Sequence, residues 1–312
     1  MRTRARQGVC AAPTVCEGRG VDDDATLPPH PPTTPTGEPV PAAARVATAA
    51  ADPHVLASDT VANLRDVGGR PTADGGRVRR GLVLRSAELR SAAVADDPVV
   101  TRLGVRTVVD LRTAAERAAA PDVLPPGARG VHADVLQVTT QAPASDLGEL
   151  LRRPQEASQF LAALDPAAQM RRTYVDLVVG ESGRTGYATL LRRFLDPGAA
   201  PVLYHCTAGK DRTGWATTVL LLAVGADEAV AREEYLAVNP AVRAMYAPLL
   251  QGFADVGGDP ELLVPLLEVR EEYLDAAFGA VAELFGSFAA YLRDGLGLTD
   301  TEVAALRERL TA

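Results

Sequence analysis

Short runs of apolar, mainly β-branched residues recur along this chain and constrain its fold more than any other feature. They lie at residues 82–84, 105–111, 131–135 and 202–204. Each run is apolar on both faces, and helical patterns separate the runs. Such runs are typical of strands in a parallel sheet that helices cover. The sequence therefore predicts an α/β fold with a central, mostly parallel sheet flanked by helices.

Helical patterns surround the last of these runs. Residues 184–194 form an amphipathic pattern that leads into the strand at 202–204, and residues 213–224 continue as a helix that ends before Gly225. Further helices are predicted at 227–238, 265–292 and 299–310.

Two segments depart from this alternation and suggest the domain organisation. Residues 1–55 contain nine of the 23 prolines and much Ala, Thr and Gly, so we interpret them as a disordered tail that buries too little apolar surface to fold. Residues 137–173 have weak strand character and a helical piece around 157–164. We expect this stretch to be a helical lid inserted into a single domain of residues 56–312.

Charge and cysteine usage narrow the classes of function. A net charge of −8 does not favour nucleic acid or an anionic membrane. No apolar run reaches the ~18 residues of a membrane span, and no secretory signal is visible. Cys10 and Cys16 lie in the tail, which leaves Cys206 as the one cysteine of the predicted domain. This pattern suits a reducing compartment. We expect a cytoplasmic protein, with export without a recognisable signal peptide as the alternative.

The segment HCTAGKDRTG at residues 205–214 joins the strand at 202–204 to the helix that follows. We call its residues 206–212 the cysteine loop. Parallel sheets place ligand sites at the carboxyl ends of their strands, and a Cys-x5-Arg loop that closes onto a helix N-terminus turns its backbone N–H groups inward around a tetrahedral dianion. The predicted phosphate-binding residues are Thr207, Ala208, Gly209, Lys210, Asp211 and Arg212.

The cysteine loop contains the groups needed for covalent phosphoryl transfer. The positive field of a helix N-terminus and of Arg212 favours the thiolate of Cys206, which is the reactive form of cysteine. Thr213 can donate its hydroxyl to that thiolate, and the planar fork of Arg212 can bind two phosphate oxygens. Attack by Cys206 would give a phosphocysteine that water then hydrolyses. This chemistry needs no metal, and two of the four histidines lie in the tail, so we expect neither metal nor cofactor.

The ten residues 205–214 resemble the active-site loop of the bacterial atypical protein tyrosine phosphatases. Segments that look like other recurring parts of that family are NLRDVGG at 63–69, LRSAE at 84–88, VDLRT at 109–113 and VREEYL at 269–274. The resemblance runs from about residue 58 to the end of the chain. It implies an enzyme that hydrolyses phosphotyrosine in proteins, with phosphoserine, phosphothreonine or phosphoinositides as secondary substrates. We expect it to act as a monomer.

Three aspartates compete as the acid that protonates the leaving oxygen. Asp211 lies beside Arg212 and resembles the loop aspartate of this family. Asp110 ends a predicted strand and matches the family's Asp-Leu-Arg aspartate, to which a catalytic role is attributed. Asp176 lies 30 residues before Cys206, near the spacing found in dual-specificity phosphatases. Each has a structural alternative: Asp211 could satisfy loop amides, Asp110 could pair with Arg112 or Arg85, and Asp176 could lie on a solvated helix face.

Two further features bear on substrate choice and on the surroundings of the site. Lys210 is the only lysine among 32 basic residues. It adds positive charge to the loop, but Thr207 replaces the first lysine that related lipid-phosphatase loops use for inositol phosphates. In the segment 63–69, we expect Arg65 and Asp66 to form a structural ion pair near the site.

Other functions remain possible on sequence alone. A catalytically silent phosphate-binding module would share the loop, although both Cys206 and Arg212 are retained. Sulfurtransferases typically have a shorter loop, and arsenate reductases of the low-molecular-weight type place it near the N-terminus. The sequence therefore favours a phosphatase.

Overall fold

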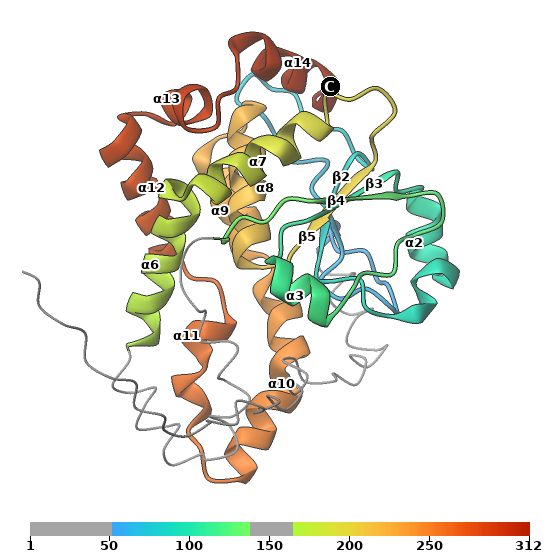
Figure 1. Ribbon diagram of the computed structural model, residues 1–312, viewed down its shortest axis with the longest axis vertical. Helices are drawn as coiled ribbons and strands as arrows, with labels where there is room; N and C mark the ends of the chain where they lie inside the picture. Colours follow the sequence, from blue (N-terminus) through green and yellow to red (C-terminus); the bar gives the residue numbers. More distant parts are fainter. Residues whose placement is uncertain (1–51, 138–164) are drawn as a thin grey trace, which may run out of the picture. The chain divides into compact units, whose positions relative to one another are not determined.

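The computed structural model describes residues 52–137 and 165–312, which Figure 1 shows as a ribbon. The predicted tail, residues 1–55, lies outside the described residues except for its last four positions. The central part of the predicted insertion, residues 138–164, also lies outside them. The last residues of that predicted insertion, from Pro166 onward, belong to helix α6.

A five-stranded sheet forms the centre of the fold. Its strands lie in the order β1-β2-β5-β3-β4. The strands β2, β5, β3 and β4 are parallel to one another, and only β1 pairs antiparallel, with β2. The α/β fold with a mostly parallel sheet is therefore confirmed, and each of the four predicted apolar runs overlaps a strand. The strands span Arg65–Asp66 (β1), Val83–Ser86 (β2), Thr107–Asp110 (β3), Arg129–His132 (β4) and Val202–His205 (β5).

Helices account for most of the remaining described residues. The α-helices are α2 (Pro98–Leu103), α3 (Ala114–Ala119), α6 (Pro166–Val179), α7 (Glu181–Arg193), α8 (Asp211–Ala223), α9 (Glu228–Leu236), α10 (Asn239–Asp255), α11 (Val264–Leu267), α12 (Glu271–Phe285), α13 (Phe288–Ala290) and α14 (Asp300–Leu310). Two 3₁₀ helices, η1 (Ala92–Asp96) and η2 (Pro260–Leu262), and a π-helical turn, η3 (Tyr291–Gly295), complete the set.

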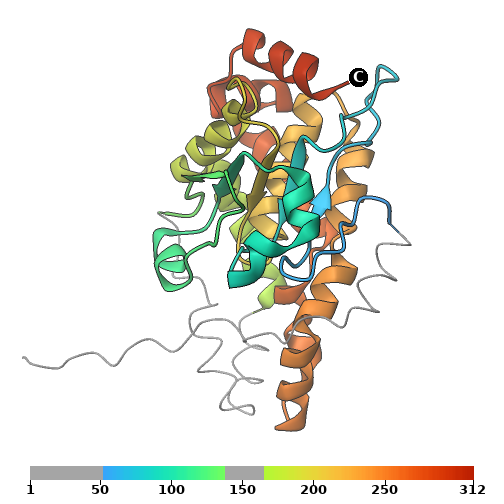
Figure 2. The same cartoon turned by 90° about the vertical axis from the view of Figure 1, so that its right-hand side faces the viewer.

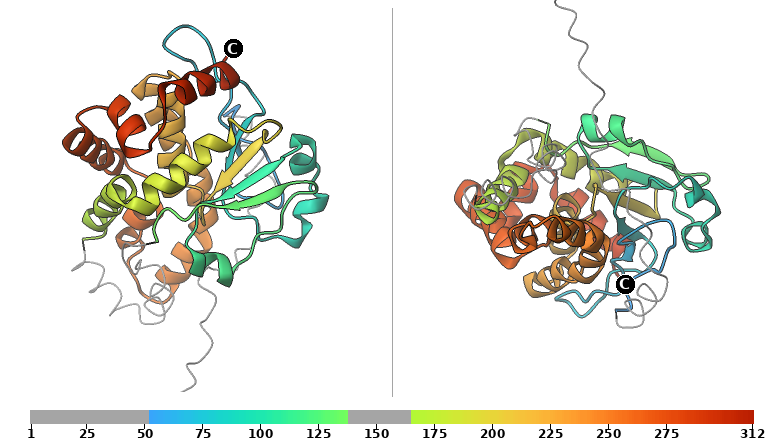
Figure 3. Two further views of the ribbon diagram at one scale, coloured as in Figure 1. Left: turned by 45° about the horizontal axis from the view of Figure 1, so that its top comes forward. Right: turned by 90° about the horizontal axis from the view of Figure 1, so that it is seen from below.

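Apolar side chains cover both faces of the sheet. In β5, Val202 and Tyr204 belong to a large core cluster that includes residues of α7 and α8, whereas Leu203 belongs to a second cluster that includes Val100 of α2. Figure 3 shows α2 and α7 on opposite sides of the sheet. Because successive side chains of a strand point to opposite faces, this division explains why the strand carries apolar residues on both faces.

The prediction of one helix over residues 265–292 is wrong. The chain instead forms α11, α12 and α13 there. Gly286 ends α12 in the left-handed region at φ 73°, which glycine adopts at little cost. Ser287 follows as an extended residue whose side chain accepts a hydrogen bond from Ala290 N. A glycine C-cap and a serine N-cap in succession therefore interrupt the apolar pattern.

Helices α10 and α11 extend away from the sheet, as Figures 1 and 2 show. They hold a small cluster of their own, with Phe253, Leu263 and Leu267 buried. Tyr246 of α10 packs against both this cluster and the main core. Within the described ranges, no helix combines the length and the apolar character that crossing a membrane requires.

The carboxyl ends of the parallel strands meet at one edge of the sheet. β5 lies between β2 and β3, with His205 opposite both Ser86 and Asp110. The residue after His205 is Cys206, so the sheet delivers the cysteine to the middle of this edge. Ligand sites in parallel sheets lie at such edges.

Candidate active site

Backbone geometry fixes the shape of the cysteine loop. The loop leaves β5 after His205 and enters α8 at Asp211. Gly209 has φ 67°, in the left-handed region, and a Cβ added there would lie 2.3 Å from the carbonyl oxygen of Ser86. A side chain at this position would thus meet both backbone strain and a backbone clash. Only glycine fits the turn.

Side chains outside the loop hold its carbonyl groups. Asn63 Nδ2 donates to the carbonyl oxygens of Ala208 and Gly209, each at 3.1 Å, and Arg85 Nη2 donates to that of Gly209 at 2.7 Å. The amides of residues 207–210 donate to no acceptor in the part of the chain that the structure describes. With its carbonyls engaged and its amides unpaired, the loop has the properties of an anion-binding nest.

A buried carboxylate in α9 holds Arg85 and two other arginines. Glu234 is fully buried. Its oxygens lie 3.0 Å from Arg65 Nε, 2.5 Å from Arg70 Nη2 and 3.7 Å from Arg85 Nη1. Burial alone would raise the pKa of Glu234, but the charges of these arginines lower it to about 2. Glu234 therefore supplies a buried negative charge beside the arginine that supports Gly209.

The expected ion pair between Arg65 and Asp66 is not formed. Arg65 pairs with Glu234 and with Asp52. Asp66 instead accepts hydrogen bonds from the amides of Gly68, at 2.8 Å, and Gly81, at 3.0 Å. The prediction failed because adjacent residues of a strand point to opposite faces, which directs the two side chains to different partners.

Cys206 and Arg212 occupy the two ends of the loop. Cys206 is a free thiol and is 2% exposed. Burial opposes the charge of Arg212, but its pairing with Glu116 and the neighbouring charges of Cys206 and Asp211 raise its pKa above the ordinary value. Thr213 is buried, and its Oγ1 has no hydrogen-bond partner within the described residues. Donation from Thr213 to the thiolate therefore stays a prediction.

Glu116 of α3 accepts hydrogen bonds from both terminal nitrogens of Arg212. The sequence analysis did not predict this residue as part of the site. Arg212 Nη1 donates to Glu116 Oε2 at 2.6 Å and Nη2 to Oε1 at 2.7 Å. Thr207 Oγ1 also donates to Glu116 Oε1, at 2.7 Å. Burial would raise the pKa of Glu116, but Arg212 lowers it far below its usual range. A guanidinium has five N–H donors, so this pairing orients Arg212 and leaves donors for a phosphate.

A short sequence signal marks Glu116. It lies three residues after Thr113, and the two form a capping box in which Thr113 Oγ1 accepts from Glu116 N while Glu116 Oε2 accepts from Thr113 N. A Thr-x-x-Glu pattern immediately after a predicted strand announces a helix N-terminus. It would have placed Glu116 at the carboxyl edge of the sheet, beside the cysteine.

Asp211 lies at the first position of α8, where one of its oxygens accepts a hydrogen bond and the other forms an ion pair. Tyr174 Oη donates to Oδ1 at 3.0 Å, and Lys210 Nζ lies 2.6 Å from Oδ2. The Asp211 side chain is 19% exposed, so it can still reach solvent or a substrate. Tyr174 comes from α6 and was not among the predicted site residues.

Asp110 lies in a denser ionic cluster at the end of β3. Arg112 donates through Nε to Oδ1 and through Nη2 to Oδ2, each at 2.9 Å. Burial would raise the pKa of Asp110, but hydrogen bonds from Arg112 and the charge of His205 lower it. Its side chain is 6% exposed. One guanidinium thus donates to both oxygens of Asp110. This is the pairing with an arginine that we gave as the structural alternative to a catalytic role.

The same cluster brings two carboxylates and an imidazole together. His205 Nε2 lies 3.0 Å from Asp122 Oδ2, and His205 Nδ1 lies 3.1 Å from the carbonyl oxygen of Cys206. Asp110, Asp122 and His205 are close enough to share a metal ion. Arg112 Nη2 donates to both Asp110 and Asp122 at 2.9 Å, so a guanidinium already supplies the positive charge between them.

Asp176 lies elsewhere. It lines a surface pocket along α6 with Ala168, Arg171, Arg172 and Val175. Its position is roughly 200° around the helix from Tyr174, the residue that meets the cysteine loop. Burial raises the pKa of Asp176, but the structure gives it no contact with the loop. Of the three candidate acids, Asp176 is the one that the fold keeps away from Cys206.

Comparisons with known proteins agree with this site. The sequence profile of the tyrosine phosphatase family matches residues 56–312. A protein of Cupriavidus necator named as a tyrosine-protein phosphatase is 36% identical over 254 residues, which are 81% of this chain and 87% of the relative. The triple specificity protein phosphatase PtpB of Mycobacterium tuberculosis is 32% identical over 268 residues, covering 78% of this chain and 95% of PtpB. The chain therefore belongs to the tyrosine phosphatase family.

Proposed function

We propose that this chain is a protein tyrosine phosphatase that hydrolyses phosphomonoesters through a phosphocysteine at Cys206. The observation that supports this most is the cysteine loop itself. Its carbonyls are held by Asn63 and Arg85, its amides are unpaired within the described residues, and Cys206 and Arg212 lie at its two ends. Such a loop can bind a phosphate dianion and stabilise the charge that develops on its three equatorial oxygens.

In the first step, the Cys206 thiolate attacks phosphorus opposite the leaving oxygen. The S–P bond forms as the P–O bond breaks, and Asp211 gives its proton to the departing oxygen. Arg212 and the loop amides bind the equatorial oxygens throughout. Glu116 keeps the guanidinium in one orientation because it holds both terminal nitrogens.

In the second step, water attacks the phosphocysteine. The Asp211 carboxylate takes a proton from that water as the new P–O bond forms. The S–P bond breaks, its electron pair returns to Cys206 as thiolate, and inorganic phosphate leaves. The charge of Arg212 again stabilises the transition state. The enzyme is then ready for another substrate.

Asp211 suits these proton transfers better than Asp110. Both oxygens of Asp110 are held by Arg112 in a site that is 6% exposed, whereas Asp211 belongs to the loop and is 19% exposed. We infer that Asp110 orients Arg112 and supports His205 instead of donating a proton.

Two sets of variants test the proposed reaction. Cys206→Ser should abolish turnover of p-nitrophenyl phosphate but retain binding of orthovanadate, because Arg212 and the loop amides remain. With phenyl phosphate as substrate, Asp211→Asn should remove the basic limb of the pH–rate profile and slow turnover by about 10²–10⁴-fold, whereas Asp110→Asn should keep that limb. Turnover by Cys206→Ser would refute the assignment of Cys206 as the nucleophile. Loss of the basic limb only in Asp110→Asn would show that Asp110, and not Asp211, is the general acid.

The substrate class is proposed from the family and from the loop. PtpB is named a triple specificity phosphatase, and we propose phosphoserine, phosphothreonine and phosphoinositides as secondary substrates of this chain. Lys210 is 4% exposed and lies against Asp211, so its charge is engaged before any second phosphate arrives. This favours phosphotyrosine in proteins over phosphoinositides.

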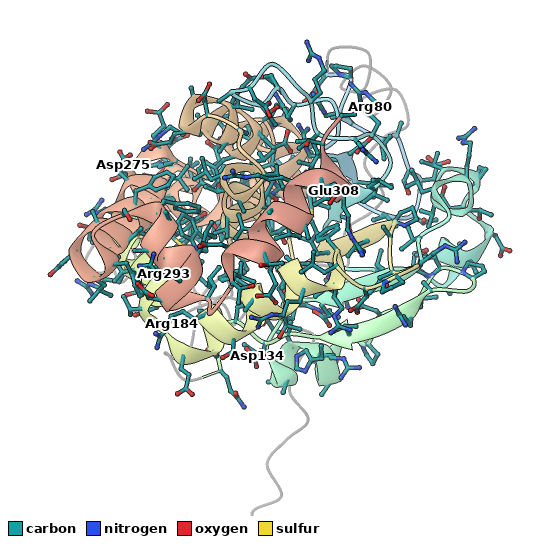
Figure 4. The ribbon with its side chains drawn as sticks, turned by 90° about the horizontal axis from the view of Figure 1, so that it is seen from above. Arg80, Asp134, Arg184, Asp275, Arg293 and Glu308 are labelled. Atoms are coloured by element: carbon teal, nitrogen blue, oxygen red, sulfur yellow. The ribbon has the colours of Figure 1, made fainter. Side chains whose placement is uncertain are left out.

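The setting of the enzyme is also proposed. Figure 4 labels both acidic and basic side chains on one face, among them Glu308, Asp275, Arg80 and Arg293, and the net charge of −8 does not favour nucleic acid. We propose a monomer that works in the cytoplasm. We also propose that residues 1–55 form a tail outside the phosphatase domain of 56–312, and that 137–173 include its lid.

A further inference from the structure

Two buried tyrosines connect Asp211 to helices outside the cysteine loop. Tyr174 comes from α6 and Tyr235 from α9, and they are 0% and 1% exposed. Tyr235 Oη donates to Tyr174 Oη at 2.8 Å, and Tyr174 Oη donates to Asp211 Oδ1 at 3.0 Å. We call Tyr235, Tyr174 and Asp211 the tyrosine relay.

The number of protons fixes the direction of the relay. An ionised carboxylate only accepts hydrogen bonds, so the single hydroxyl proton of Tyr174 points to Asp211. The oxygen of Tyr174 then accepts the proton of Tyr235, whose other acceptor, the carbonyl oxygen of Arg270, lies farther away at 3.3 Å. Burial raises the pKa of both tyrosines well above the ordinary value, so both remain donors at any working pH.

Packing keeps the relay in one geometry. The rings of Tyr174 and Tyr235 meet edge to face, with centroids 6.1 Å apart and an interplanar angle of 86°. Tyr273 of α12 packs against Tyr174 from another side, with centroids 5.8 Å apart. A Cβ added at Gly214 of α8 would lie 3.0 Å from the Tyr235 ring. The two tyrosine rings thus have little room to rearrange, which keeps the Tyr174 hydroxyl directed at Asp211.

We propose that Tyr174 and Tyr235 are positioning residues for proton transfer by Asp211. This inference rests on the proposed function. Tyr174 donates to Oδ1, which leaves Oδ2, the oxygen that faces Lys210 Nζ at 2.6 Å, to carry the proton, so the carboxyl group keeps its orientation while that proton moves to the leaving oxygen. The hydrogen bond from Tyr174 also stabilises the carboxylate that remains. The hydroxyls of Tyr174 and Tyr235 form no hydrogen bond with Arg212 or with the amides of residues 207–210, so removing them should leave phosphate binding intact.

The inference predicts a loss that depends on the leaving group. Tyr174→Phe should lower kcat/KM for phenyl phosphate by about 10-fold or more, which is the effect of losing a hydrogen bond to a charged group. It should lower kcat/KM much less for p-nitrophenyl phosphate, whose leaving oxygen needs little help from an acid. Binding of orthovanadate should stay unchanged. Tyr235→Phe should show the same pattern more weakly, since the Tyr174–Asp211 bond survives.

Tyr273→Phe is the matched control. It removes a phenol hydroxyl from a ring that also contacts Tyr174, but that hydroxyl donates to the carbonyl oxygen of Pro265 and not to the relay. Its kinetics should keep the wild-type dependence on the leaving group. In an Asp211→Asn background, Tyr174→Phe should cause no further loss, because its effect passes through Asp211.

The outcomes separate this inference from the proposed function. If the wild type shows no Cys206-dependent turnover, the proposed function fails first. If turnover depends on Cys206 but Tyr174→Phe lowers kcat/KM equally for both esters, weakens binding of orthovanadate, or adds its full loss to Asp211→Asn, only the relay is refuted. Binding of orthovanadate and the thermal unfolding midpoint, measured for each variant, identify a loss that comes from misfolding. If Tyr174→Phe misfolds, the comparison of Tyr235→Phe with Tyr273→Phe still tests the relay.

Discussion

At the scale of single residues, the site is defined by which charges are paired. Arg212 and Glu116 share two short hydrogen bonds, and Thr207 adds a third contact to the same carboxylate. Hydrogen bonds and charge from Glu116 are the main cause of the raised pKa of Arg212. The groups of the reaction are thus arranged before a substrate arrives, as preorganised catalysis requires.

Glu116→Gln tests this arrangement. A neutral amide can accept from only one terminal nitrogen of Arg212 and no longer offsets its charge, so the guanidinium should lose its fixed orientation. We expect kcat/KM for p-nitrophenyl phosphate to fall by about 10-fold or more, since a hydrogen bond to a charged group is lost. Glu283→Gln, an exposed change on α12, is the control. Equal kinetics for the two variants would show that Glu116 does not contribute to catalysis.

At the scale of elements, the sequence was most informative where a local pattern decides the structure. Apolar runs located β2, β3, β4 and β5, and the motif at residues 205–214 located the cysteine loop. Helix α10 was not predicted because Pro248 lies inside it, and proline normally argues against a helix interior. The residues that contact the loop were not predicted for another reason. Glu234 and Tyr174 are far from Cys206 in sequence, and only the packing of α6 and α9 brings them together.

Gly209→Ala tests whether the turn of the loop is as constrained as its geometry indicates. Alanine there should meet the Ser86 carbonyl 2.3 Å away in addition to the unfavourable φ of 67°. Gly198→Ala is a matched control, because Gly198 has φ 71° but nothing within 4 Å of an added Cβ. Both variants should lose about 1 kcal/mol from the left-handed backbone, but only Gly209→Ala should lose turnover. Activity retained in Gly209→Ala would show that the loop can open.

At the scale of the whole molecule, the buried ionic groups tie stability to pH. The pKa of Glu234 is about 2, against an ordinary value of 4.5. A lowered pKa contributes stability that is present above the ordinary value and is lost as the pH falls toward the folded one. The contribution of Glu234 should therefore be complete above about pH 5 and should fade between about pH 4.5 and pH 2.

Urea unfolding as a function of pH measures this contribution. The free energy of unfolding of the wild type should fall on acidification, with about 3 kcal/mol of the fall due to Glu234. Glu234→Gln should be less stable at neutral pH, since Arg65, Arg70 and Arg85 lose their common partner, and its acid dependence should be flatter. Glu233→Gln, whose side chain is 71% exposed, should follow the wild type. The same flattening in Glu233→Gln would contradict the assignment.

The most direct test of the central claim is to trap the intermediate. A rapid-quench experiment with a ³²P-labelled phosphotyrosine peptide, stopped in denaturant and followed by peptide mapping, should place the label on Cys206. The label should accumulate in Asp211→Asn if water activation is slowed more than phosphorylation. Cys206→Ser should carry no label, although it still binds orthovanadate. Label on any other residue, or continued turnover by Cys206→Ser, would contradict the account.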